Sequence, residues 1–173
     1  AETRFDRVGF YDNGATITFG GALMGGMYAD IVVSDSVLTG NTAALAGGAI
    51  LGGSSSSLEV LDSQIANNNA GEAGGGIFAG DSLILTGSTV SGNEAGSTTT
   101  NTVVGGGVFV SGTAEITDSV ISSNRASSDT RDASGGGLYL ASASATITNT
   151  QISGNTASGE GIGTSFSRGG GIN

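Results

Sequence analysis

Apolar residues in this chain occur in short runs that alternate with polar residues and are separated by Gly, Asn, Asp and Ser. An alternation with a period of two is typical of β-strands that bury one face. The clearest run recurs five times, at residues 31–33, 58–60, 83–85, 114–116 and 145–147. Strands this short are not stable as isolated hairpins, so the pattern predicts units that bury their apolar faces against one another.

Two further motifs recur with a similar spacing. The first is an Asn that follows a large apolar side chain by three residues and precedes an Ala by two. Its Asn residues are Asn13, Asn41, Asn68, Asn93, Asn124 and Asn155, at successive separations of 28, 27, 25, 31 and 31 residues. The second is a Gly pair, then Ala or Gly, then an aliphatic residue, at 20–23, 47–50, 74–77, 105–108, 135–138 and 169–172. Repeats of this length predict a solenoid.

The three motifs give three short strands in each repeat and no helical segment. The predicted fold class is therefore all-β, a right-handed parallel β-helix solenoid of about six coils of 25–34 residues. We expect one domain over residues 1–173, with coils at about 1–29, 30–56, 57–81, 82–112, 113–143 and 144–173. The chain lacks the Leu period of a leucine-rich repeat, and a propeller blade needs about 40 residues.

Strand alternation assigns faces to the recurring positions. Inward columns are expected at Ile31, Leu58, Leu83, Ala114 and Ala145, at Val33, Val60, Leu85, Ile116 and Ile147, and at Leu23, Ile50, Ile77, Val108, Leu138 and Ile172. Between the first two columns, solvent-facing positions are Val32, Glu59, Ile84, Glu115 and Thr146. The column of six Asn residues is expected to form a structural ladder that hydrogen-bonds the backbone and its own neighbours. The Gly pairs suit corners with positive φ.

A second set of apolar residues follows the third inward column by one position. It comprises Met24, Leu51, Phe78, Phe109 and Tyr139. Alternation sends these side chains outward, where they would form an apolar stripe that stacks on sugars or packs against another subunit. The Gly and Ala residues on either side also allow the opposite assignment, in which the five side chains belong to the core.

Composition narrows the function classes. The chain has 33 Gly, no Pro, Cys, His or Lys, and a net charge of −10. Nucleic acids and anionic membranes attract cationic surfaces, so neither is an expected partner. Cys-based metal sites and disulfides are excluded. No apolar run reaches the length that spans a bilayer, so no direct membrane insertion is expected.

Candidate chemistry is sparse. Asp35, Asp62 and Asp118 form the best acidic column, and neighbouring coils would bring Asp35 and Asp62 near the spacing of a retaining glycosidase pair. Their place after a strand, where other coils carry Gly87 or Asn149, favours turn bonding instead. No Lys or His is present to stabilise a lyase intermediate. We expect no catalytic residues, no enzyme activity and no cofactor, with Ca²⁺ as the one weak candidate ligand.

Two further readings concern the surface. Thr-x-Thr pairs of the kind that orders ice occur at 16–18 and 146–148. The equivalent positions between them carry Glu59 and Glu115, so charges interrupt the array.

The corner between Asn-x-Ala and Gly-Gly is three residues long at 44–46 and 71–73 and longer at 96–104, 127–134 and 158–168. Insertions on one side of a solenoid often carry binding, so this corner is the candidate contact face. Its candidate residues are Thr98, Thr99, Thr100, Asn101, Asp129, Arg131, Asp132, Ser165 and Arg168.

The pairing of Phe10-x-x-Asn13 with residues 20–23 (GGAL) resembles the FxxN and GGA[ILV] repeats of chlamydial polymorphic outer membrane proteins. Residues 47–50 (GGAI) match the second motif again, whereas other copies carry an aliphatic residue for Phe or Gly for Ala. Similar motifs recur in bacterial autotransporter adhesin passengers. The resemblance implies a secreted or cell-surface bacterial protein that acts as an adhesive stalk and contacts a glycan or a host-cell surface.

The coil ends suggest a second partner. The chain starts near the beginning of one coil, stops at residues 169–172 of another, and shows no capping helix. Uncapped solenoid ends present strand edges that pair with further strands. We therefore expect end-to-end self-association into a filament, or continuation in a longer parent chain. A polysaccharide-acting enzyme is the third reading.

Overall fold

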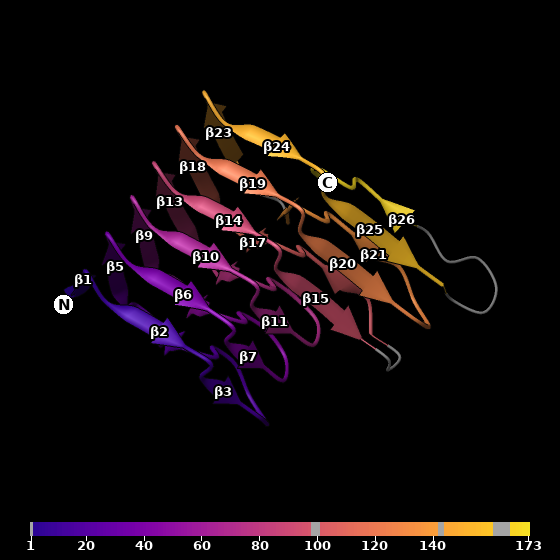
Figure 1. Cartoon of the computed structure of the whole chain (residues 1–173), viewed down its shortest axis with the longest axis horizontal. Coiled ribbons are helices and arrows are strands. Elements are labelled where there is room, and N and C mark those ends of the chain that lie inside the picture. The colour runs from indigo at the N-terminus through magenta and orange to yellow at the C-terminus, as the bar shows by residue number, and fades with distance from the viewer. Residues whose placement is uncertain (1, 98–100, 142–143, 161–166) are drawn as a thin grey trace.

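The computed structural model describes residues 2–97, 101–141, 144–160 and 167–173, and these residues form an all-β parallel solenoid. All strand pairings are parallel, and the described residues contain no helix. Figure 1 shows the coils stacked in sequence order, with equivalent strands side by side. The predicted class, an all-β parallel solenoid, is confirmed.

Five sheets run along the solenoid, and we name them A to E. Sheet A holds β1 (Glu2–Asp6), β5 (Asp30–Ser34), β9 (Ser57–Leu61), β13 (Ser82–Thr86), β18 (Thr113–Thr117) and β23 (Ser144–Thr148). Sheet B holds β2 (Gly9–Tyr11), β6 (Val37–Thr39), β10 (Gln64–Ala66), β14 (Thr89–Ser91), β19 (Val120–Ser122) and β24 (Gln151–Ser153). Sheet C holds β3 (Gly14–Ala15), β7 (Thr42–Ala43), β11 (Asn69–Ala70), β15 (Glu94–Ser97), β20 (Arg125–Ser128) and β25 (Thr156–Gly159).

Sheets D and E complete the coils. Sheet D holds β4 (Leu23–Met24), β8 (Ile50–Gly52), β12 (Ile77–Ala79), β17 (Val108–Val110) and β22 (Leu138–Leu140). Sheet E holds β16 (Val103–Val104), β21 (Ala133–Ser134) and β26 (Ser167–Arg168). Sheets A, B and C have six strands each and therefore five steps between strands, so the chain makes about five turns, slightly fewer than the six expected.

Each coil has more strands than the expected three. Residues 37–43, for example, carry one of the recurring motifs but form two strands, β6 and β7. The break falls at Gly40, whose φ is +70°, and at Asn41, whose side chain is buried. Equivalent corners carry Asn67, Gly92 and Ser123 with positive φ, a backbone state that ends a strand and turns the chain.

The core consists of the predicted inward columns. In the middle coils, Ile50, Leu58 and Ile116, for example, are at most 1% exposed. In the last coil Ala145 is exposed and Ile172 is 43% exposed, because no further described coil packs on it. Val32 differs from expectation, because it occupies a solvent-facing register between Arg4 and Glu59 yet is only 5% exposed.

Candidate functional site

The apolar stripe, defined as Met24, Leu51, Phe78, Phe109 and Tyr139, lies on the outer side of sheet D in continuous register. Phe78 and Phe109 stack with ring centroids 4.5 Å apart and planes 7° apart. Phe109 and Tyr139 stack at 5.7 Å and 8°. The rings therefore turn their faces towards one another along the solenoid, which leaves mainly their edges for a partner.

One side of the stripe packs against the corner that follows sheet C. Leu51, Ala46 and Ala73 form a buried cluster with Phe78, Val104 and Phe109, separate from the main core. Bridges from Ala46 to Ala73 and from Ala73 to Val104 keep this corner in register with the stripe. The stripe thus belongs neither to the core nor wholly to the surface: Leu51 is 7% exposed, whereas Met24 is 61% exposed.

On its other side the stripe borders a groove of about 520 Å³. The lining residues are Phe19, Met24, Gly25, Gly26, Met27, Leu51, Gly53, Ser54, Phe78, Gly80, Phe109 and Ser111. No charged side chain is among them, although the chain carries a net charge of −10. Sequence reasoning found the stripe but missed Phe19 and Met27, because they lie outside the repeated positions.

The long corners are not free loops in the described part of the chain. Each enlarges sheet C by two residues, as in β15 and β20 compared with β11, and then returns as a strand of sheet E. A small second core of Ala95, Val103, Ala126 and Ala133 fills the space between them, and all four side chains are fully buried. The described parts of the long corners therefore form an ordered second layer.

Candidate residues of this corner differ in how they are held. The amide of Asn101 donates to a carboxylate oxygen of Glu72, and its backbone oxygen accepts from the Ser128 hydroxyl at 3.2 Å. A hollow of about 410 Å³ lies beside Asn101 and Glu72, where the short corners meet the long ones. The backbone N–H of Arg131 donates to Ser128 Oγ at 3.0 Å, which fixes that corner.

The remaining candidates anchor through their backbones. Asp129 N–H donates to Ser97 O at 3.1 Å, Asp132 O accepts from Val103 N–H at 3.0 Å, and Arg168 O accepts from Gly135 N–H at 3.0 Å. Asn101, Asp129, Arg131 and Arg168 are exposed. Thr98, Thr99, Thr100 and Ser165 lie outside the described residues.

The six Asn residues of the column form a continuous hydrogen-bonded ladder, and the four middle ones lie inside the solenoid. Asn68 shows the pattern: its backbone N–H and its Nδ2 both donate to Asn93 Oδ1 at 2.9 Å, and Nδ2 also donates to Leu38 O at 3.0 Å. Asn41, Asn93 and Asn124 repeat this arrangement and are at most 1% exposed. Among the described residues, no buried side-chain nitrogen or oxygen is left without a partner.

A second ladder was not assigned from the sequence. A hydroxyl side chain in each of five coils accepts a hydrogen bond from the backbone N–H of the equivalent residue in the preceding coil, at 3.0–3.3 Å. These residues are Ser36, Ser63, Ser88, Ser119 and Thr150. Their hydroxyls donate to the carbonyl two residues earlier, for example Ser63 Oγ to Leu61 O at 2.7 Å. The signal was present, because a hydroxyl residue recurs at this position in five coils.

The acidic column occupies turns. Asp35, Asp62 and Asp118 have φ of +48°, +46° and +53°, which is the left-handed state that Asp tolerates better than most residues. A Cβ at Gly87 would lie 2.2 Å from Asp62 Oδ1, so the carboxylate covers the next coil's turn. Among the described residues no group of three or more acidic side chains is arranged to hold a metal ion.

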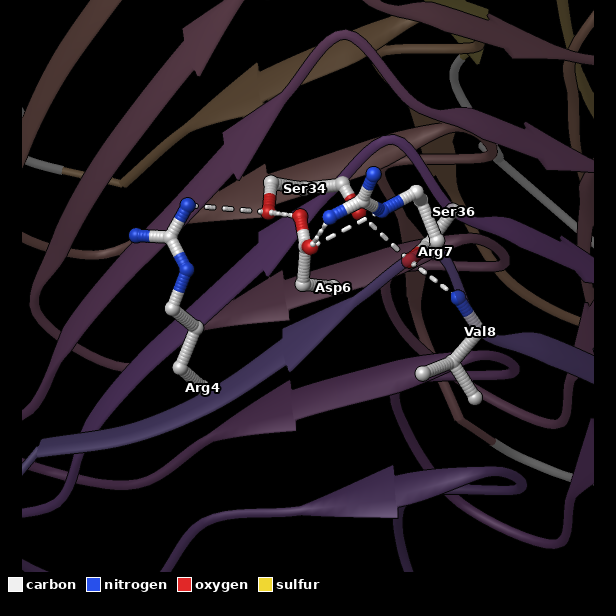
Figure 2. Close-up of polar contacts among 6 residues, drawn as sticks. All are labelled: Arg4, Asp6, Arg7, Val8, Ser34 and Ser36. Atoms are coloured by element: carbon white, nitrogen blue, oxygen red, sulfur yellow. Dashed lines mark hydrogen bonds and ion pairs between the residues drawn. The ribbon is translucent and has the colours of Figure 1, made fainter.

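A polar cluster at the N-terminal coil was also missed (Figure 2). Asp6 accepts hydrogen bonds from Ser34 Oγ at 2.7 Å and from Arg7 Nη2 at 2.8 Å, and Arg4 Nη2 donates to Ser34 Oγ at 3.1 Å. The Ser34 hydrogen bond, followed by that of Arg7, lowers the pKa of Asp6 from its ordinary value of 3.8. This cluster joins β1 to β5 and holds two of the chain's five Arg residues.

Comparisons with known proteins add no relative. No family model, no curated protein and no solved structure matches the chain. No helix long and apolar enough to cross a membrane occurs in the part of the chain that the structure describes.

Proposed function

We propose that the chain is a non-catalytic structural and adhesive module that works outside the cell, at a bacterial surface. The observation that carries this proposal is the use of the buried polar side chains. The buried Asn residues of the ladder and the recurring hydroxyls hydrogen-bond along the solenoid and fix one coil on the next. Buried networks that are fully satisfied in this way rigidify a fold, which suits a stalk.

The resemblance of residues 10–13 and 20–23 to chlamydial polymorphic outer membrane protein repeats supports the finer assignment to an adhesin of the autotransporter type. The proposed contact face is the ordered long corner, where Asn101, Asp129 and Arg131 are exposed and Asn101 lines the 410 Å³ hollow. An Asn amide and exposed charges of both signs suit hydroxyl-rich ligands, so a glycan or a glycosylated cell surface is the proposed partner.

Beads coated with the chain provide a direct test against a glycan array and cultured cells. The contact-face variant carries Asp129→Ser and Arg131→Ser, and the control carries two Ser substitutions away from this face, Glu59→Ser and Glu115→Ser on sheet A. We expect binding that the first pair abolishes and the control retains. Binding to no glycan or cell surface, or equal loss in both variants, would contradict the proposed contact face.

End-to-end assembly is the second proposal, and a specific feature favours it. Asn155 Oδ1 accepts from Asn124, so the backbone N–H and Nδ2 of Asn155 lie where the ladder would continue. In the first coil, Asn13 donates to Asn41 Oδ1, and its own Oδ1 is positioned to accept from a preceding coil. Further coils, from a second copy or a longer chain, would extend the ladder in register.

Electron microscopy beside light scattering tests this second proposal. Filaments with a repeat near 29 Å are expected if the six strand layers of one chain, at roughly 4.8 Å each, stack on those of the next chain. Asn13→Ala should shorten them, whereas Glu59→Ser, on a side face, should not. A monodisperse monomer at all protein concentrations would count against self-assembly.

A further inference from the structure

The groove beside the stripe has an unusual chemical character for this chain. Its lining provides only two polar side chains, Ser54 and Ser111, and no carboxylate, amide or guanidinium. Its volume of about 520 Å³ lies in the range of small-ligand pockets. An uncharged groove in a chain of net charge −10 points to an uncharged, apolar occupant.

The floor is bare because of how the coils stack. A Cβ at Gly53 would lie 2.7 Å from Gly26 O, and one at Gly80 would lie 2.8 Å from Gly52 O. Any larger residue at these two positions would collide with the backbone of the preceding coil, so only Gly fits there. Gly26 differs, because a Cβ there meets no atom within 4 Å.

The floor also offers few hydrogen bonds to a ligand. Gly25 N–H donates to Leu51 O at 2.8 Å, and Gly80 N–H donates to Gly52 O at 2.9 Å. A peptide backbone or a sugar hydroxyl buried here would lose its hydrogen bonds to water with little replacement. The stacked rings of Phe78 and Phe109 add to this argument, since sugars pack on ring faces and these faces cover one another.

We propose that the groove binds a single unbranched hydrocarbon chain of a monomeric amphiphile. Hydrocarbon needs no hydrogen bonds, and the flexible side chains of Met24 and Met27 adapt readily to such a ligand. Both are largely exposed, at 61% and 67%. From Met24 to Phe109 the wall rises through three coil steps, or about 14 Å at roughly 4.8 Å each, which is about the length of a dodecyl chain.

The two methionines make the test direct, because the chain contains no others and both line the groove. Protein labelled with ¹³C at the Met methyls is titrated with a non-ionic dodecyl amphiphile below its micelle concentration. Both methyl signals should shift and saturate. Shortening the alkyl chain should weaken binding by roughly two- to fourfold per methylene removed, as expected for buried hydrocarbon.

Gly26→Leu fills the groove from its open floor position and should weaken dodecyl binding at least tenfold. Tyr11→Gln is the control. Tyr11 is exposed to a similar extent as Met27, at 58%, but lies on sheet B and not in the groove. If Gly26→Leu lowers the melting temperature, Met27→Gln tests the same wall while Met24 still reports. Both groove variants should lose affinity and the control should keep it.

Four results would overturn the proposal. Met shifts that follow protein concentration alone, with a dimer in light scattering, would assign the groove to a second copy. Binding to phosphatidylcholine vesicles without any response to monomeric amphiphile would assign it to a membrane surface. Unchanged Met signals, or equal dodecyl affinity in Gly26→Leu and Tyr11→Gln, would remove the hydrocarbon site.

Discussion

Asn93→Ala removes one rung from the middle of the Asn ladder. Asn93 Oδ1 accepts two hydrogen bonds at 2.9 Å, from the backbone N–H and the Nδ2 of Asn68. Its Nδ2 donates to Ile65 O at 2.9 Å and to Asn124 Oδ1 at 3.0 Å. Alanine supplies none of these groups, and at 1% exposure no bulk water reaches the site to replace them.

The size of the effect follows from the donors left behind. The backbone N–H of Asn68 loses the acceptor that the ladder gives it, and Nδ2 of Asn68 keeps only its bond to Leu38 O. Each buried donor without a partner destabilises a fold by about 1–3 kcal/mol. Two such donors predict a loss of about 4 kcal/mol, a large part of the 5–15 kcal/mol typical of a folded domain.

Urea unfolding of the variant against the unmodified chain measures this loss. Asn13→Ala is the control, because Asn13 is exposed and its Nδ2 donates only to Asn41 Oδ1. Water can replace that bond, so we expect less than about 1 kcal/mol. Equal losses in the two variants, or a loss below about 1 kcal/mol for Asn93→Ala, would refute the ladder as the source of rigidity.

Three further predictions concern single features. Gly107→Ala should lower the melting temperature, because its Cβ would lie 2.7 Å from Gly137 O and 2.8 Å from Asn124 Cγ, whereas Gly26→Ala should leave it unchanged. The lowered pKa of Asp6 means that its ionised form stabilises the fold above its ordinary pKa of 3.8, and that this contribution is lost as the pH falls through the folded-state value. Asp6→Asn should therefore destabilise the chain at pH 7 and reduce the acid dependence of its unfolding, and an unchanged pH profile would contradict this. A chelator should leave the melting temperature unchanged, since the described residues contain no acidic cluster suited to a metal, and a clear decrease would point to bound Ca²⁺.

Side-chain direction was predictable because it is a local property of a strand. Alternation alone sufficed to place Leu58 and Val60 inward and Glu59 outward, and spacing alone aligned Asn68 with Asn93. The Ser63 ladder could have been found in the same way, from its hydroxyl recurring beside the acidic column. These features depend on one coil's sequence and on its repetition.

Other features depend on how neighbouring coils differ, which a repeat pattern does not describe. Sheet E forms only where successive long corners pair, as Val103 does with Ala133. The groove exists because stacking keeps Gly53 and Gly80 bare beside the ring of Phe78. The sequence did not decide whether the side chains of the stripe point inward or outward, for a related reason. The residues that pack on them, Ala73 and Val104, belong to another corner of the coil.

Hydrogen exchange at the ladder is the most direct test of the rigid-scaffold account. The backbone N–H groups of Asn41, Asn68 and Asn93 donate to side chains of the next coil, all inside the solenoid. We predict that they exchange only through global unfolding, with the free energy found in urea. Exchange of these amides within minutes, at native pH and low temperature, would show that the corners open locally and would contradict the account.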